Sequence, residues 1–106
     1  MKIGVVISSD DSETVWNAFR LGNFARAMED EVSVFLLGKG VELESLDTDK
    51  FGVTEQVQTF VQSGGKIFAC GTCLEIHQLE PSEIYTVSKL KDIHEIVKES
   101  DKIITF

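Results

Sequence analysis

Short apolar runs alternate with longer stretches of helical periodicity along this chain. Five runs are mostly apolar and nearly continuous, as in strands buried on both faces of a sheet, and they cover residues 3–7, 31–37, 66–70, 84–87 and 102–106. Between these runs, apolar residues recur three or four positions apart, which predicts amphipathic helices over residues 13–29, 54–62 and 90–97. Residues 41–53 are weakly patterned and predict a loop or a short helical turn.

Capping signals support these boundaries. Asp11 or Ser12 is suited to be the N-cap of the first helix, and Gly64-Gly65 is typical of a helix C-terminus. Thr72 and Glu75 have the spacing of a capping box, which predicts a further short helix that Pro81 ends.

The resulting order of strands and helices predicts an α/β fold. Regular alternation favours a mostly parallel five-stranded sheet with helices on both faces, a three-layer α/β/α arrangement joined by right-handed crossovers. The length of 106 residues suits one core, so we expect a single domain over residues 1–106. No helical pattern follows residues 102–106, and we expect a neighbouring subunit to cover part of that strand.

Charge and hydropathy narrow the classes of partner. The formal net charge is -8 and the ten basic residues are scattered, which argues against a nucleic-acid surface. The acidic surplus suits a partner with a basic patch, or serves solubility alone. No segment approaches the roughly 20 apolar residues of a membrane span, and no signal-peptide layout is present, so we expect a cytoplasmic protein without a membrane partner.

The only two cysteines, Cys70 and Cys73, lie where the third predicted strand turns into a helix. This position is the carboxyl edge of a parallel sheet, where open α/β folds bind ligands. The start of a helix also favours the thiolate form of a cysteine. In a reducing compartment, two cysteines three positions apart are more often catalytic, redox-active or metal-binding than structural. Cys70 could still be a small apolar side chain that ends a core strand, although Gly71 would let another chain approach it closely.

Three other sites deserve comparison. Thioredoxins also carry two thiols at a helix start, but here the pair follows the third strand and no Trp precedes it. Cys70, Cys73 and His77 could face one metal ion, yet a fourth ligand is missing from the local sequence, so we predict neither a metal nor a cofactor. Asp10 and Asp11 resemble the acidic pocket of response-regulator receivers, but Cys70 stands where that pocket needs a third aspartate.

At these residues the sequence resembles the DsrE/DsrF/TusD-like family of sulfur-relay proteins. The resemblance extends over nearly the whole chain. It is carried by the opening strand with its Ser/Asp-rich loop, the helix from Ala18-Phe19 to Ala25-Arg26-Ala27, the strand that runs into Gly38-Lys39-Gly40-Val41, the strand that ends in Cys70, and the closing run of residues 101–106. Several members have an Arg shortly after the cysteine, whereas this chain has Ile76-His77-Gln78, which weakens thiolate activation or assigns it to His77.

The resemblance implies a small sulfur-relay protein, a sulfurtransferase or a sulfur carrier, that accepts and passes sulfane sulfur as a persulfide on Cys70. Cys73, an additional cysteine found in some members, would attack the persulfide and release its sulfur, or protect the thiol as a disulfide. We expect Ser8, Ser9, Gly71, Thr72 and His77 to form the substrate pocket. The implied partners are sulfur-donor and sulfur-acceptor proteins, and the implied assembly is a homotrimer or homohexamer. The alternatives are an oligomeric module that binds a metal or small ligand without turnover, and thiol-disulfide exchange through Cys70 and Cys73.

Overall fold

A parallel five-stranded sheet forms the centre of the computed structural model, which describes residues 1–106. Its strands are β1 (Lys2–Ile7), β2 (Glu31–Leu36), β3 (Lys66–Cys70), β4 (Thr86–Ser88) and β5 (Lys102–Thr105). Every neighbouring pair is parallel, and the order across the sheet is β4-β3-β2-β1-β5. The predicted α/β fold is therefore confirmed.

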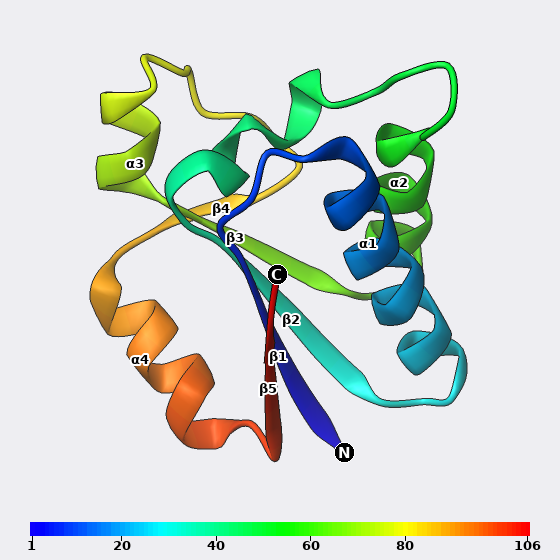
Figure 1. Cartoon of the computed structure of the whole chain (residues 1–106). Coiled ribbons are helices and arrows are strands. Elements are labelled where there is room, and N and C mark those ends of the chain that lie inside the picture. Colours follow the sequence, from blue (N-terminus) through cyan, green and yellow to red (C-terminus); the bar gives the residue numbers. More distant parts are fainter.

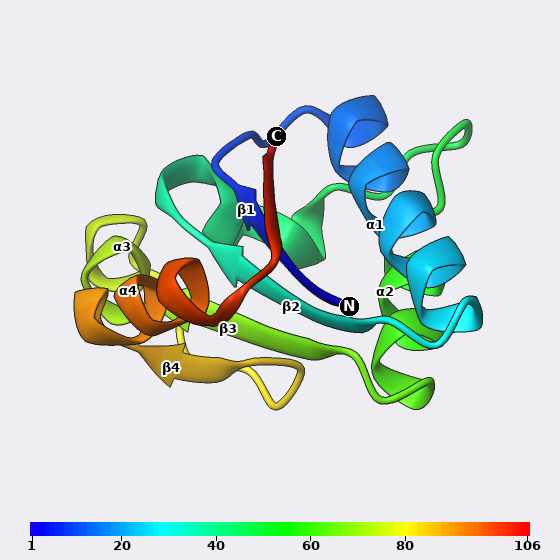
Figure 2. The same cartoon turned by 90° about the horizontal axis from the view of Figure 1, so that it is seen from below.

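Helices cover the two faces of the sheet unequally (Figures 1 and 2). α1 (Ser12–Ala27) and α2 (Val53–Gln62) pack together on one face, and α4 (Leu90–Glu99) lies on the other. This division follows from the strand order. From β1 to β4 the chain steps in one direction across the sheet, and the connection to β5 returns in the opposite direction, so crossovers of one hand place α4 on the opposite face. None of the helices has the length and apolar character that a membrane span requires.

The main hydrophobic core lies between the sheet and the α1–α2 layer. Its fully buried residues include Val5, Ile7 and Leu36 from the strands. The rings of Phe19 and Phe60 join the two helices in an edge-to-face contact, with centroids 5.5 Å apart. In contrast, α4 contains no fully buried residue. The two faces of the sheet therefore differ in how firmly they are covered.

The predicted ends of α1 and α2 are largely confirmed. The Asp11 carboxylate accepts a hydrogen bond from the Thr14 N–H at 2.9 Å, as an N-cap does. At the end of α2, Gly64 has a φ of 95°, and the N–H groups of Gly64 and Gly65 donate to the carbonyls of Val61 and Phe60. This is a Schellman motif, in which glycine occupies the left-handed position.

Two predicted boundaries are wrong. The fourth strand is expected over residues 84–87, but pairing with β3 begins only at Thr86, because the chain still turns at residues 83–85 and the Ile84 N–H donates to Ser82 Oγ. The short helix α3 (Gly71–Ile76) does not extend to Pro81. Gln78 adopts a φ of 56°, and the N–H of Leu79 donates to the Leu74 carbonyl, which closes the helix several residues earlier.

The start of α3 also differs from the prediction. Thr72 is not its N-cap, because that position belongs to Cys70, whose Sγ accepts the hydrogen bond from the Cys73 N–H. Residues 41–53, where a loop or a short helical turn is expected, begin inside a 3-10 helix, η1 (Gly38–Ser45), which follows β2 closely. The start of α3 and the start of η1 both bring backbone N–H groups to the end of β3.

Candidate functional site

Cys70 and Cys73 lie together at the carboxyl edge of the sheet, where β3 ends and α3 begins. The Cys73 N–H donates to Cys70 Sγ at an N···S distance of 3.4 Å. Both cysteines are free thiols; Cys70 is only 6% exposed, whereas Cys73 is half-buried. The first turn of α3 thus holds the sulfur of Cys70 in place.

Gly38 contributes a second backbone contact to the pair. Its N–H donates to Cys73 Sγ at an N···S distance of 3.2 Å. Gly38 follows β2, the neighbour of β3, and parallel strands end at the same edge of a sheet. Its φ of 55° is one that glycine adopts at little cost, which aims the amide toward α3.

The two thiols also interact directly, and this sets different roles for them. Burial raises the pKa of the Cys73 thiol, and a hydrogen bond and charge repulsion from Cys70 raise it further, while the Gly38 N–H opposes the shift. Cys73 therefore stays protonated at neutral pH, with its S–H available to Cys70. This arrangement makes Cys70 the hydrogen-bond acceptor of the pair.

A cavity of about 640 Å³ gives access to both cysteines. Gly71 and Thr72, which we expect in the substrate pocket, are among the residues that line it. A methyl group at Gly71 would lie 3.2 Å from the Val87 side chain, so glycine allows α3 to start close against β4. The other lining residues come from the end of β2, from α3 and from the β4–α4 connection: Leu37, Glu75, Val87, Ser88, Lys89 and Leu90.

Ser8, Ser9 and His77, which we expect in the pocket, do not line this cavity. Ser8 donates to the Phe106 carbonyl, and Ser9 accepts from the Asp11 N–H. Both follow β1, which β2 separates from β3. His77 caps the far end of α3, where its Nδ1 lies 3.4 Å from Glu42 Oε1.

Several residues that line the cavity are not predicted from the sequence. Leu37 and Gly38 follow the second predicted strand. Had the sequence shown that this strand lies beside the third, it would have predicted that both residues lie near Cys70. Lys89 and Leu90 carry no such signal, because they reach the site only through the fourth strand, which is short and begins later than its sequence pattern indicates.

The structure offers no ready metal site at the cysteines. No group of three His, Cys, Asp or Glu side chains is arranged to hold a metal ion. His77, the third ligand of the zinc alternative, faces Glu42 instead. Two thiols alone leave half of a tetrahedral zinc coordination sphere unfilled.

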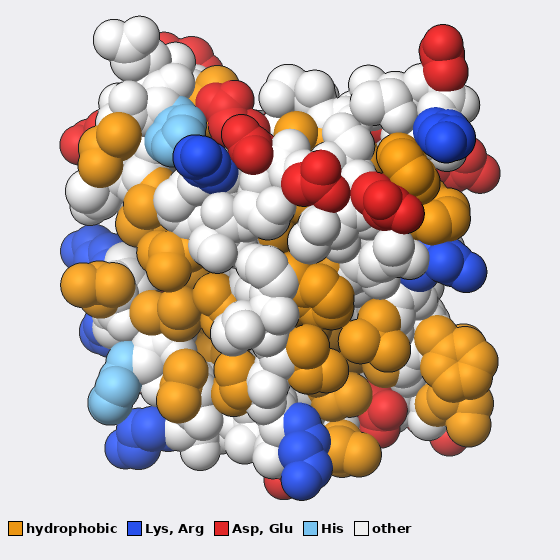
Figure 3. All heavy atoms as spheres, viewed as in Figure 1, with side chains coloured by type: hydrophobic (Ala, Val, Ile, Leu, Met, Phe, Trp, Pro, Cys, Tyr) orange, Lys and Arg blue, Asp and Glu red, His pale blue; other side chains and the backbone are white.

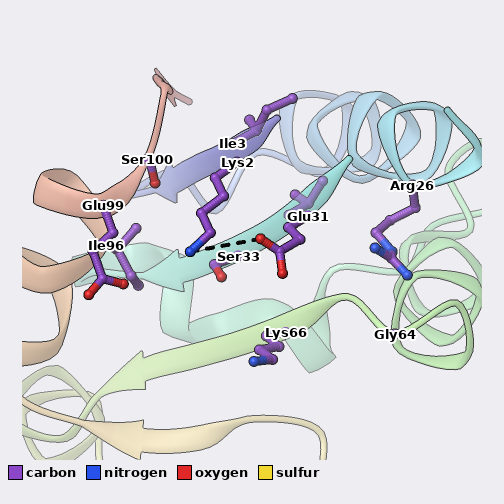
Figure 4. A pocket seen from close by; sticks show the side chains of 11 residues that line it. Lys2, Ile3, Arg26, Glu31, Ser33, Gly64, Lys66, Ile96, Glu99 and Ser100 are labelled. Atoms are coloured by element: carbon purple, nitrogen blue, oxygen red, sulfur yellow. Dashed lines mark ion pairs between the residues drawn. The ribbon is translucent and has the colours of Figure 1, made fainter. Parts of the chain in front are cut away.

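A second hollow, of about 370 Å³, lies at the opposite edge of the sheet (Figure 4). Lys2 and Glu31 on its wall form an ion pair at 3.9 Å. The Arg26 guanidinium, which also lines it, donates to the carbonyls of Ser63 and Asp30. This hollow contains no cysteine, so the cavity at Cys70 remains the candidate site.

Comparisons with known proteins identify the family and the fold. A sequence model of the DsrE/DsrF-like family matches residues 1–106. No curated protein sequence matches the chain at a significant level. Among solved structures, the ychN protein of E. coli superposes with a TM-score of 0.84 at 17% identity, with all of both chains covered.

Two further structures have the same fold. A Bacteroides thetaiotaomicron protein of unknown function has a TM-score of 0.79 at 23% identity, with 99% of this chain and 94% of that chain covered. A Methanobacterium thermoautotrophicum protein of unknown function has a TM-score of 0.76 at 18% identity, with 99% and 98% covered. At such identities the superpositions establish the fold alone.

Proposed function

Because the chain belongs to the DsrE/DsrF-like family, we propose that it acts in sulfur relay and carries sulfane sulfur as a persulfide on Cys70. The observation that supports this most directly is the pairing of the thiols. Cys70 Sγ accepts the Cys73 N–H at 3.4 Å, beside a cavity that opens the site to a donor. Both features suit a thiolate that must meet an incoming sulfur.

The proposed transfer needs no net oxidant. The Cys70 thiolate attacks the outer sulfur of a donor persulfide, a new S–S bond forms on Cys70, and the donor's S–S bond breaks. The donor departs as a thiolate, which takes up the proton that the transferred sulfur carried. An acceptor thiolate then repeats the step on the outer sulfur of the Cys70 persulfide.

Cys73 has two parts in this scheme. As a thiol it donates to Cys70, and its raised pKa limits its own attack on the persulfide. As a thiolate it would attack the inner sulfur, form a Cys70–Cys73 disulfide and expel hydrosulfide. The same contact between thiols supports thiol-disulfide exchange as a second candidate function.

We assign the protein to the cytoplasm, with donor and acceptor partners and a homotrimeric or homohexameric assembly. The acidic net charge of -8 favours partners with a basic docking surface. Exposed apolar side chains on α1 and β5 support self-association, because a monomer gains nothing from them.

Mass spectrometry tests the proposal. Wild-type protein incubated with a persulfide donor should gain the mass of one sulfur atom, and Cys70→Ser should gain none. Cys73→Ser should keep the sulfur at least as long as wild type. Since the chain has no other cysteine, the double variant is the matched blank.

The same experiment separates the candidate functions. Release of sulfur from the Cys70 persulfide also leaves a Cys70–Cys73 disulfide, so Cys73→Ser decides between the two functions: a gain of one sulfur atom by this variant supports sulfur relay. Loss of two hydrogens from wild type, with no gain of sulfur by Cys73→Ser, would favour disulfide exchange. Sulfur that remains on Cys70→Ser would contradict the assignment of Cys70.

A further inference from the structure

The cavity at Cys70 is lined by one cationic and one anionic side chain that form no ion pair with another side chain. Lys89 contributes from the β4–α4 connection, and Glu75 contributes from α3. The ion pairs of the structure join Met1 to Asp30, Lys2 to Glu31 and His77 to Glu42, so neither residue takes part in one. Both side chains are exposed and free to turn toward a ligand.

The rest of the lining is apolar or small. Leu37, Val87 and Leu90 supply apolar surface, and Val87 and Leu90 are 48% and 72% exposed. The volume of about 640 Å³ lies within the range of roughly 300–1,000 Å³ that small-molecule sites occupy. The cavity thus has the size of a metabolite site, with two thiols and two opposite charges on its walls.

These charges restrict the ligand. A simple anion would meet Lys89 but also the Glu75 carboxylate, and a neutral ligand would leave both charges without a partner. A zwitterion offers an anionic group to Lys89 and a cationic group to Glu75. An α-amino acid whose side chain ends in sulfur carries a carboxylate, an ammonium and the reacting atom in one small molecule.

On the basis of the proposed function, we propose that the sulfur donor is a small zwitterionic persulfide of the amino-acid class. Lys89 binds its carboxylate, Glu75 binds its ammonium, and the persulfide points to Cys70. The Cys70 thiolate forms the new S–S bond to the outer sulfur, the S–S bond of the donor breaks, and the amino-acid thiol leaves with the proton. Lys89 and Glu75 determine specificity and take no part in the bond changes.

Kinetics of persulfide formation test this assignment with cysteine persulfide as the donor. The rate of sulfur gain on Cys70 is followed by mass spectrometry against donor concentration. Lys89→Gln and Glu75→Gln should each raise the half-saturating concentration about tenfold, because each removes one charge-assisted contact. The maximal rate should change little.

Matched variants and a matched donor complete the design. Lys91→Gln and Glu80→Gln change the same charges on exposed residues outside the cavity and should leave the kinetics unchanged. The persulfide of N-acetylcysteine methyl ester lacks both charges. With this donor, the half-saturating concentration should be the same for the cavity variants and for wild type.

Equal half-saturation for wild type, Lys89→Gln and Glu75→Gln would overturn the zwitterion assignment and favour a protein persulfide as donor. The proposed function would stand in that case as long as Cys70→Ser gains no sulfur. Sulfur gain by Cys70→Ser would overturn the proposed function itself, so the two failures are distinguishable.

Discussion

Cys73 lies between an amide and a thiol, and this position governs its reactivity at each pH. The Gly38 N–H stabilises the thiolate, but burial and the neighbouring sulfur of Cys70 outweigh it, so the pKa of Cys73 lies above its ordinary value of 9.0. At neutral pH the side chain is therefore a donor of a hydrogen bond rather than a nucleophile.

Release of hydrosulfide from the Cys70 persulfide should consequently depend on pH. Only the Cys73 thiolate attacks, so release should be slow at pH 7 and should rise about tenfold per pH unit until the pH reaches the pKa of Cys73. A sulfide-selective electrode measures the release from persulfidated protein. Cys73→Ser should show no such rise, and maximal release already at neutral pH in wild type would contradict the raised pKa.

At the scale of elements, η1 positions the site through a close approach to β1. A methyl group on Gly40 would overlap the carbonyl oxygen of Ile7, a backbone atom that is already hydrogen-bonded to the Leu37 N–H. Glycine at this position lets η1 lie against the sheet edge, and the same element begins with the amide that contacts Cys73.

Gly40→Ala should therefore destabilise the fold by about 1–3 kcal/mol, the usual range for overpacking. Urea unfolding measures the change, and faster alkylation of Cys73 should accompany it as η1 moves. Gly52→Ala is the control, because its methyl group would meet Glu55 at an ordinary distance of 3.7 Å. Equal stability of the two variants would show that η1 has room to shift.

The helices and strands are predicted well from the sequence where nearby residues determine their position and their ends. The period of apolar residues locates the strands and long helices, and Gly64-Gly65 predicts the end of α2 because the left-handed position there favours glycine. The end of α3 escapes prediction, since Gln78 occupies the equivalent position. The order of strands is also absent from the local pattern, which is why Ser8 and Ser9 are expected beside Cys70 although β2 separates β1 from β3.

For the whole molecule, the most informative surface is apolar. Figure 3 shows hydrophobic side chains spread over the face between α4 and α1, across the β5 edge. Leu21 and Phe24 of α1 and its C-cap Met28 form an exposed stripe, and Ile103 of β5 is 38% exposed. Of the other aromatic residues on α1, Phe19 is buried and Trp16 packs against Phe51. Phe24 is exposed, and burial in a subunit interface would explain this.

Light scattering should accordingly give a mass well above the 11.8 kDa of one chain at micromolar concentration. Phe24→Glu should lower this mass, because a charge on the stripe opposes its burial. Val61→Glu places the same charge on an exposed apolar position of α2 and should not. A wild-type protein with the mass of a single chain would contradict the proposed assembly.

The pairing of β5 with β1 has a consequence for biosynthesis. β2, β3 and β4 join the sheet in the order in which the ribosome makes them, each beside the strand before it. The other side of β1 has no partner until β5 appears, and the contact between Lys2 and Asp101 spans 99 positions. Throughout translation a nascent chain therefore presents the open edge of β1, and polysomes that carry this message hold many such edges close together. Chaperone protection of that edge would matter most until β5 has emerged from the ribosome and pairs with β1.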